Sequence, residues 1–189
     1  MNLPNKLTLA RVALIPVFMI FAANRMWLIA GLIFAAASLT DFFDGYLARK
    51  NNWVTDFGKF ADPLADKILT TTAFLYMMAD GVCSPVVLVI IIAREFAVSG
   101  LRMVAAGAKD GKVIAANMWG KVKTVIQMLT ICLYYLGCGV ESMAGVGTVN
   151  SAFLSQVIAY GLCWVVAAVT AVSGVKYLWD NRQFINTMK

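Results

Sequence analysis

The chain has 189 residues, of which 61% are hydrophobic and 14% charged, whereas about 25% of the residues in an average soluble domain are charged. This composition excludes an ordinary soluble globular domain and indicates an integral membrane protein. The formal net charge of +6 fits a membrane face that lies against anionic lipid, so nucleic acid is not expected as a partner.

Apolar segments of about 20 residues, long enough to cross a bilayer, recur along the chain. We place them at residues 7–24, 27–48, 58–79, 85–107, 119–139 and 152–179. The sequence therefore predicts an all-α integral membrane protein, a six-transmembrane-helix bundle. Because no break in composition or long linker divides the chain, we expect a single membrane domain over residues 1–189.

Four carboxylates lie where the second segment ends and the third begins. Asp41 and Asp44 are three residues apart and Asp62 and Asp66 are four apart, so on helices each pair shares one face. The purely apolar part of the third segment has 12 residues and covers only about 18 Å. Its helix must therefore extend back through the acids to cross, and the sequence leaves open whether Pro63 begins that helix or kinks it.

If the two acidic faces meet, their carboxylate oxygens form the ligand set of a hard cation such as Mg²⁺, Mn²⁺ or Ca²⁺. One pair of acids would be equally well explained by a structural hydrogen bond between helices, but four favour a site for two divalent ions. The chain contains no His, so a carboxylate is the expected proton acceptor.

The fourth and fifth segments carry four cations. Arg94 and Arg102 are eight residues apart in the fourth, and Lys121 and Lys123 open the fifth. Arg94 is followed by Glu95, but adjacent residues on a helix point in different directions and are expected to pair poorly. Either lysine alone could simply extend to lipid headgroups. Together, the four cations are suited to holding a phosphate dianion.

The basic residues predict the orientation. With six spans both termini lie on one side, and of the 16 Lys and Arg residues only Arg25 falls on the other. The positive-inside bias then puts both termini and the acids at the cytoplasmic face of the cell membrane. We expect a polar, metal-binding cavity on that side.

Residues 41–66 resemble the signature D-x-x-D-G-x-x-A-R-x8-G-x-x-x-D-x-x-x-D of the CDP-alcohol phosphatidyltransferases, with every fixed position filled. The resemblance implies CDP-diacylglycerol as donor, release of CMP, a homodimer, and two ions of Mg²⁺ or Mn²⁺ held by the four aspartates, with Asp66 also the general base. It further implies that the donor is bound by Gly45, Ala48, Arg49 and Gly58.

Flanking motifs resemble one branch of that family, the phosphatidylglycerophosphate synthases. These are N-x-P-N-x-L-T-x-x-R near the N-terminus, A-R-E with a later Arg, G-K-x-K-T, and Ser173-Gly174 followed by Tyr177. They imply that the acceptor is sn-glycerol 3-phosphate and that its phosphate is bound by Thr8, Arg11, Arg94, Arg102, Lys121 and Lys123. The alternatives are the same donor with inositol phosphate, serine or phosphatidylglycerol as acceptor, a divalent-cation transporter, or a non-catalytic membrane adaptor.

Overall fold

A computed structural model describes the backbone of residues 3–50, 56–107, 118–143 and 153–182. Side chains are described in these ranges apart from residues 3–7, 41–50, 56–62, 106–107 and 153–154. The described chain forms the helices α1 (Leu3–Ala23), α2 (Trp27–Lys50), α3 (Asp56–Ala79), α4 (Pro85–Gly107), α5 (Met118–Met143) and α6 (Phe153–Asp180). The all-α prediction is confirmed, and each helix coincides with one predicted segment to within a few residues.

Helix α3 answers the question that the sequence left open. It begins at Asp56, and Pro63 lies inside it. An internal proline removes one main-chain hydrogen bond of the helix, yet the helix runs on to Ala79. Asp62 and Asp66 therefore belong to the same helix as the apolar residues that follow them, as the length argument required.

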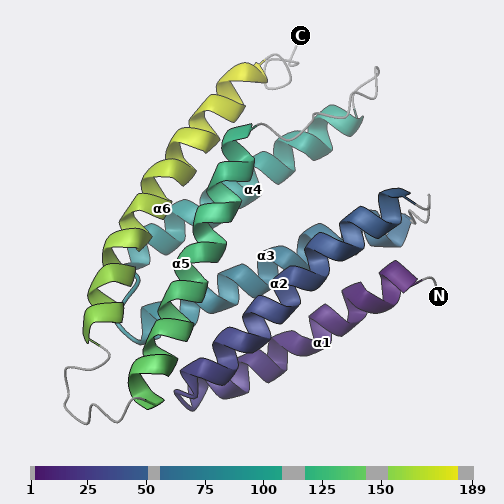
Figure 1. Ribbon diagram of the computed structural model, residues 1–189. Helices are drawn as coiled ribbons and strands as arrows, with labels where there is room; N and C mark the ends of the chain where they lie inside the picture. Colours follow the sequence, from purple (N-terminus) through teal and green to yellow (C-terminus); the bar gives the residue numbers. More distant parts are fainter. Residues whose placement is uncertain (1–2, 51–55, 108–117, 144–152, 183–189) are drawn as a thin grey trace.

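Successive helices run in alternating directions (Figure 1). The start of α1 and the ends of α2, α4 and α6 lie at one end of the bundle, here called the terminal end. The α1–α2 turn at residues 24–26 and the α3–α4 turn at residues 80–84 lie at the other, here called the turn end. Arg25, with a φ of 55°, and Gly81, with a φ of 78°, make the left-handed bends in these turns.

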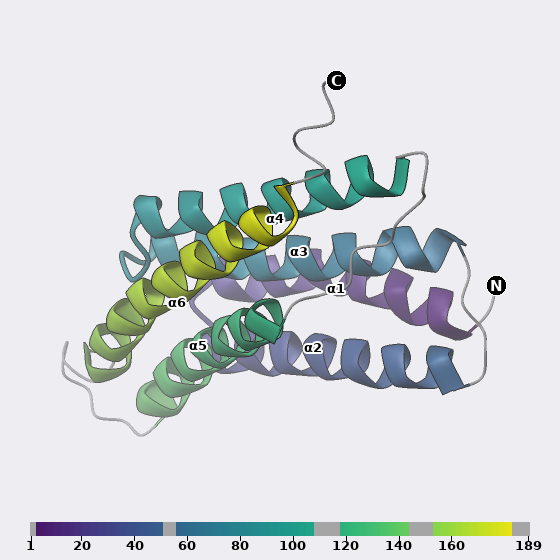
Figure 2. The same ribbon diagram turned by 90° about the horizontal axis from the view of Figure 1, so that it is seen from above.

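Helices α1, α2 and α3 form one group, and α5 joins it to α6, against which α4 also packs (Figures 1 and 2). An aromatic cluster fills the space between α1, α2 and α5: the ring of Phe18 lies 6.2 Å from that of Phe34 and 5.3 Å from that of Tyr135. The Tyr135 hydroxyl donates a hydrogen bond of 3.2 Å to the main-chain oxygen of Ala73 on α3. Aromatic rings thus fill this core, and the buried Tyr135 hydroxyl has a partner within it.

Two glycines let α2 and α5 approach closely. A Cβ on Gly139 would lie 2.6 Å from the backbone of Leu28, and one on Gly31 would lie 3.0 Å from the Cβ of Tyr135. Neither distance leaves room for a methyl group between the helices. Small residues at such crossings are typical of helix packing in membranes, where close van der Waals contact replaces the hydrophobic driving force.

Large apolar side chains cover much of the outside of the bundle, among them Ile20, Leu133 and Val175. Within the described residues, Met118–Met143 and Ser155–Asp180 are long and apolar enough to cross a membrane, and Thr8–Ala23 and Trp27–Thr40 are shorter apolar helices. An outward apolar surface of this kind suits lipid rather than water. The helices are those of a membrane protein, and the crossing of the bilayer by all six remains a prediction.

Candidate active site

A cavity of about 450 Å³ opens among five helices. Its described lining comes from the middle of α2 and α3, the middle and second half of α4, the first half of α5 and the end of α6, so it extends from the middle of the bundle towards the terminal end. The polar and charged residues in this lining are Ser38, Asp66, Lys67, Thr70, Arg94, Glu95, Arg102, Lys121, Lys123, Thr124, Gln127 and Tyr177.

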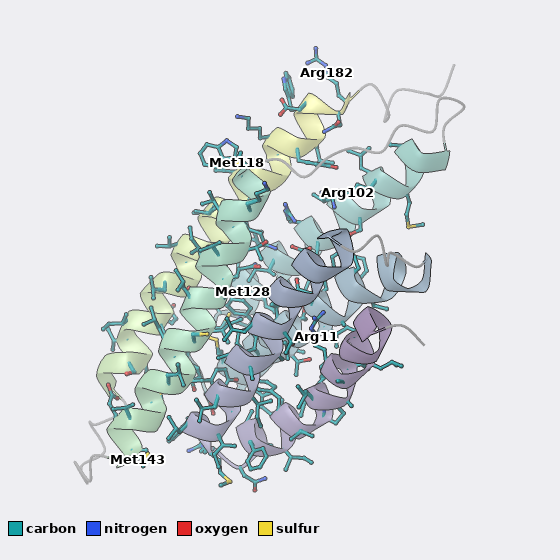
Figure 3. The ribbon with its side chains drawn as sticks, turned by 45° about the vertical axis from the view of Figure 1, so that its right-hand side comes forward. Arg11, Arg102, Met118, Met128, Met143 and Arg182 are labelled. Atoms are coloured by element: carbon teal, nitrogen blue, oxygen red, sulfur yellow. The ribbon has the colours of Figure 1, made fainter. Side chains whose placement is uncertain are left out.

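All four cations predicted to form a phosphate site line this one cavity. Arg94 and Arg102 reach it from α4, and Lys121 and Lys123 from α5. Figure 3 shows Arg102 on α4, towards the terminal end. Asp66, the predicted base, lines the same cavity from α3. The structure thus brings together residues that lie up to 57 positions apart, from Asp66 to Lys123.

Glu95 is the centre of an ion-pair network that the sequence did not reveal. Its carboxylate accepts hydrogen bonds from Lys123 Nζ and from Arg94 Nη1, the latter at 3.1 Å, and Lys67 Nζ lies 3.9 Å from its Oε2. Three helices therefore contribute a cation to one carboxylate. The expectation that Arg94 and Glu95 pair poorly is wrong. Both residues line the cavity, and there the guanidinium group of Arg94 reaches the carboxylate of its neighbour Glu95.

Lys67 is the second functional candidate that the sequence reasoning missed. Its ammonium contacts Ser99 on α4, and the Ser99 hydroxyl donates a hydrogen bond of 2.7 Å to the main-chain oxygen of Glu95. The signals were available: Lys67 directly follows Asp66, and Glu95 is the sole acid in the fourth apolar segment. Neither signal, however, says which helix a partner comes from.

The four aspartates are described unequally. The backbone of α2 carries Asp41 and Asp44, and the backbone of α3, which contacts α2, carries Asp62 and Asp66. Of their side chains only that of Asp66 is described, and among described side chains no group of three acidic, His or Cys residues is gathered as for a metal ion. The predicted donor-binding residues Gly45, Ala48, Arg49 and Gly58 lie in the same two helices, and only their backbone is described.

Thr8 and Arg11, the remaining predicted acceptor residues, are almost fully buried and are not among the residues that line the cavity. Arg11 Nε donates a hydrogen bond of 3.3 Å to the main-chain oxygen of Ala37, next to the lining residue Ser38. Figure 3 shows Arg11 on α1, a helix with no residue in the described part of the lining. The part of Thr8 and Arg11 in acceptor binding stays a prediction.

Comparison with known proteins adds an independent finding. The sequence profile of the family described as CDP-alcohol phosphatidyltransferase matches residues 1–175. The chain is 40% identical, over 98% of both chains, to the CDP-diacylglycerol–glycerol-3-phosphate 3-phosphatidyltransferase of Bacillus subtilis strain 168. It is 37% identical to the protein of the same name from Rickettsia felis, over 93% of both chains. A probable phosphatidylglycerophosphate synthase of Mycobacterium tuberculosis strain H37Rv is 38% identical, over 93% of this chain and 85% of that one.

Proposed function

The chain belongs to the CDP-alcohol phosphatidyltransferase family, and from this premise we propose that it transfers the phosphatidyl group of CDP-diacylglycerol to sn-glycerol 3-phosphate and releases CMP. The observation that carries this proposal is the collection of five cations and Asp66 around one cavity. The products are phosphatidylglycerophosphate and CMP, so the protein acts in phospholipid biosynthesis.

The acceptor's phosphate is bound by the cations of the cavity. The described lining has five cationic side chains and two carboxylates, Asp66 and Glu95, a formal net charge of +3. Attraction between this charge and a phosphate dianion is stronger in a partly buried cavity than in water, because the effective dielectric constant is lower. A neutral acceptor such as serine gains little from such a lining, whereas inositol phosphate would gain equally.

Asp66 acts as the general base. It lines the same cavity as the phosphate-binding cations, so an acceptor held there by its phosphate presents its hydroxyl groups within that space. The carboxylate takes the proton from the attacking hydroxyl, a role for which the chain offers no imidazole. Arg49, Gly45, Ala48 and Gly58 then bind the donor.

Two divalent ions, Mg²⁺ or Mn²⁺, are held by Asp41, Asp44, Asp62 and Asp66. The residues suit such ions because all four metal ligands would be carboxylates. The two acids of each pair are one helical turn apart, and the two helices that carry the pairs contact each other. When bound, the ions neutralise charge on the donor's pyrophosphate and polarise the phosphorus that is attacked.

The position of the cavity in the bundle also gives the protein an orientation in the membrane. We place the terminal end, with both termini and the cavity, at the cytoplasmic face of the cell membrane, and all six helices across the bilayer. Arg25, the one basic residue predicted outside, lies in the α1–α2 turn at the opposite end, which supports this orientation. Residues 1–189 act as one domain, in a homodimer.

The proposal is tested with purified protein, CDP-diacylglycerol and a panel of acceptors, with the products identified by mass. We expect CMP and phosphatidylglycerophosphate with sn-glycerol 3-phosphate, and much less product with serine or phosphatidylglycerol. Inositol phosphate, which the charge of the cavity does not exclude, is the decisive comparison. Efficient transfer to another acceptor would replace the acceptor assignment and keep the family. Absence of CMP release with every acceptor would overturn the enzymatic reading in favour of transport or a non-catalytic role.

A further inference from the structure

The end of α6 contains three residues that the proposed reaction does not use. Ser173 and Tyr177 are buried, and Gly174 lies between them in the sequence. Helix α6 packs along α4, and it is at these positions that it meets the two arginines of the cavity. The contacts differ in kind, but each restrains a guanidinium group.

Arg94 rests against α6 through two neighbouring residues. Its Nη2 donates a hydrogen bond of 3.3 Å to Ser173 Oγ. A Cβ on Gly174 would lie 2.9 Å from Arg94 Cγ and 3.6 Å from its Cβ, so the arginine stem occupies the space that any side chain at position 174 would need. Glycine is therefore required here for close approach, and the helix surface itself sets the path of the Arg94 side chain.

With Nη1 on Glu95 and Nη2 on Ser173, Arg94 is held at two of its nitrogens. The third, Nε, is buried and has no hydrogen-bond partner in the described part of the protein. A buried donor without a partner is costly unless something else satisfies it.

Arg102 is held by Tyr177 of α6. Its Nε donates a hydrogen bond of 3.1 Å to the Tyr177 hydroxyl, and its guanidinium carbon lies 5.6 Å from the centre of the Tyr177 ring. The ring attracts the cation electrostatically as well as sterically. This hydrogen bond uses only Nε, so among the described contacts the two terminal nitrogens of Arg102 can still bind a ligand.

We infer that Ser173, Gly174 and Tyr177 are positioning residues, which fix the guanidinium groups of Arg94 and Arg102 in the orientation that receives the acceptor's phosphate. The inference rests on the proposed function of the cavity. A free arginine side chain has many rotamers, and ordering it on binding costs affinity. Contacts made before binding remove that cost, so α6 contributes to acceptor affinity through the two arginines.

The same helix supplies matched controls. Tyr160 is a half-exposed tyrosine on α6 that does not line the cavity. Gly161 is a glycine on α6 whose added Cβ would meet nothing within 4 Å. Tyr160→Phe and Gly161→Ala thus repeat the two key substitutions, Tyr177→Phe and Gly174→Ala, at positions with no arginine contact.

The experiment titrates sn-glycerol 3-phosphate and CDP-diacylglycerol separately for these four variants and measures each melting temperature. We expect Gly174→Ala to raise the KM for glycerol 3-phosphate roughly tenfold and Tyr177→Phe about three- to tenfold. These changes are smaller than the roughly 12- to 150-fold for loss of a direct contact with a charged group, because the arginines themselves remain in place. The KM for CDP-diacylglycerol should change less than about twofold, and the controls should leave both values unchanged.

Unchanged acceptor KM in both Tyr177→Phe and Gly174→Ala would overturn the inference, as would equal increases for both substrates, which indicate general loss of packing. If Gly174→Ala does not fold, Ser173→Ala removes only a hydroxyl and decides the same question for Arg94. The proposed function fails separately: in that case the unsubstituted protein makes no phosphatidylglycerophosphate, whereas failure of this inference leaves its activity intact.

Discussion

The two ends of the bundle differ in how the charges of their buried polar groups are balanced. At the turn end, Asp80 accepts a 2.6 Å hydrogen bond from Tyr134 and lies 3.9 Å from Arg25, so one acid meets one hydroxyl and one mostly exposed cation. At the terminal end, Glu95 alone meets three cations, and further cations line the cavity around it. The first arrangement is balanced, and the second has an excess of positive charge.

That difference indicates a structural role for the charged groups at the turn end and a functional role for those at the terminal end. A carboxylate whose charge and hydrogen bonds are already matched, as those of Asp80 are by Arg25 and Tyr134, needs no ligand. An excess of cations around a cavity is costly until an anion enters, and proteins keep such an excess at sites that bind anions. Substitutions at the terminal end should therefore change catalysis or substrate affinity, and substitutions at the turn end should change stability alone.

Removal of divalent ions should have the largest effect. If four carboxylates hold the ions required by the donor's pyrophosphate, activity should fall to background in excess EDTA and return on addition of Mg²⁺ or Mn²⁺. Turnover is followed by release of CMP, with the melting temperature as a check that the helices remain folded. Full turnover in excess EDTA would exclude the metal-dependent reaction.

Asp66→Asn should come next. It removes the base and one predicted metal ligand with little change in shape, and loss of a general base lowers rates by about 10²- to 10⁴-fold. The matched substitution Asp80→Asn, at the turn end, should retain catalysis. Initial rates at saturating substrates decide between them, and similar rates for the two variants would contradict the division of the bundle into a catalytic and a structural end.

Lys121→Ala should weaken acceptor use by roughly tenfold, the low end for a contact with a charged group because this lysine is exposed. The KM for CDP-diacylglycerol should barely change. Lys176→Ala is the control, since Lys176 lies 5.5 Å from the ring centre of Trp119 and does not line the cavity. If both variants respond alike, the lysines act on anionic lipid in general and not on the acceptor.

Tyr134→Phe should have the smallest effect on function and a measurable one on stability. It leaves the partly buried Asp80 carboxylate without its 2.6 Å donor, so the free energy of unfolding should fall by about 1–3 kcal/mol. Thermal or denaturant unfolding in detergent measures the change. The KM values for both substrates should stay as they are, and a selective rise in the acceptor KM would show that the two ends are coupled.

The helices were predictable because their cause is local. Runs of about 20 apolar residues are long enough to span a bilayer, and the six predicted segments match the helices α1 to α6. The short apolar part of the third segment even required α3 to include Asp62 and Asp66, as it does. Pro63 could not be placed from the sequence, because a proline is compatible with a helix start or with a helix interior whose neighbours compensate for it.

The cation cluster was predictable only in part. Residue type and helical spacing singled out Arg94, Arg102, Lys121 and Lys123, and all four line the cavity. The pairing of Arg94 with Glu95 was predicted wrongly, because a rule for exposed, isolated helices was applied to side chains that a cavity draws together. The burial of Arg11 beside Ala37 could not be predicted, because the motif contains the same arginine whether its side chain binds a ligand or a neighbouring main-chain oxygen.

The sequence by itself determined the class of the protein, the family, and the charged residues that line one cavity, because composition, spacing and motif are properties of consecutive residues. Only the tertiary structure decided that α3, α4 and α5 each give a cation to Glu95, and that α6 holds Arg94 and Arg102 through Ser173, Gly174 and Tyr177. The physical reason is that the contacts between different helices depend on which helices are neighbours and how closely they approach. Their side chains, from 28 to 79 positions apart, carry no local trace of that choice.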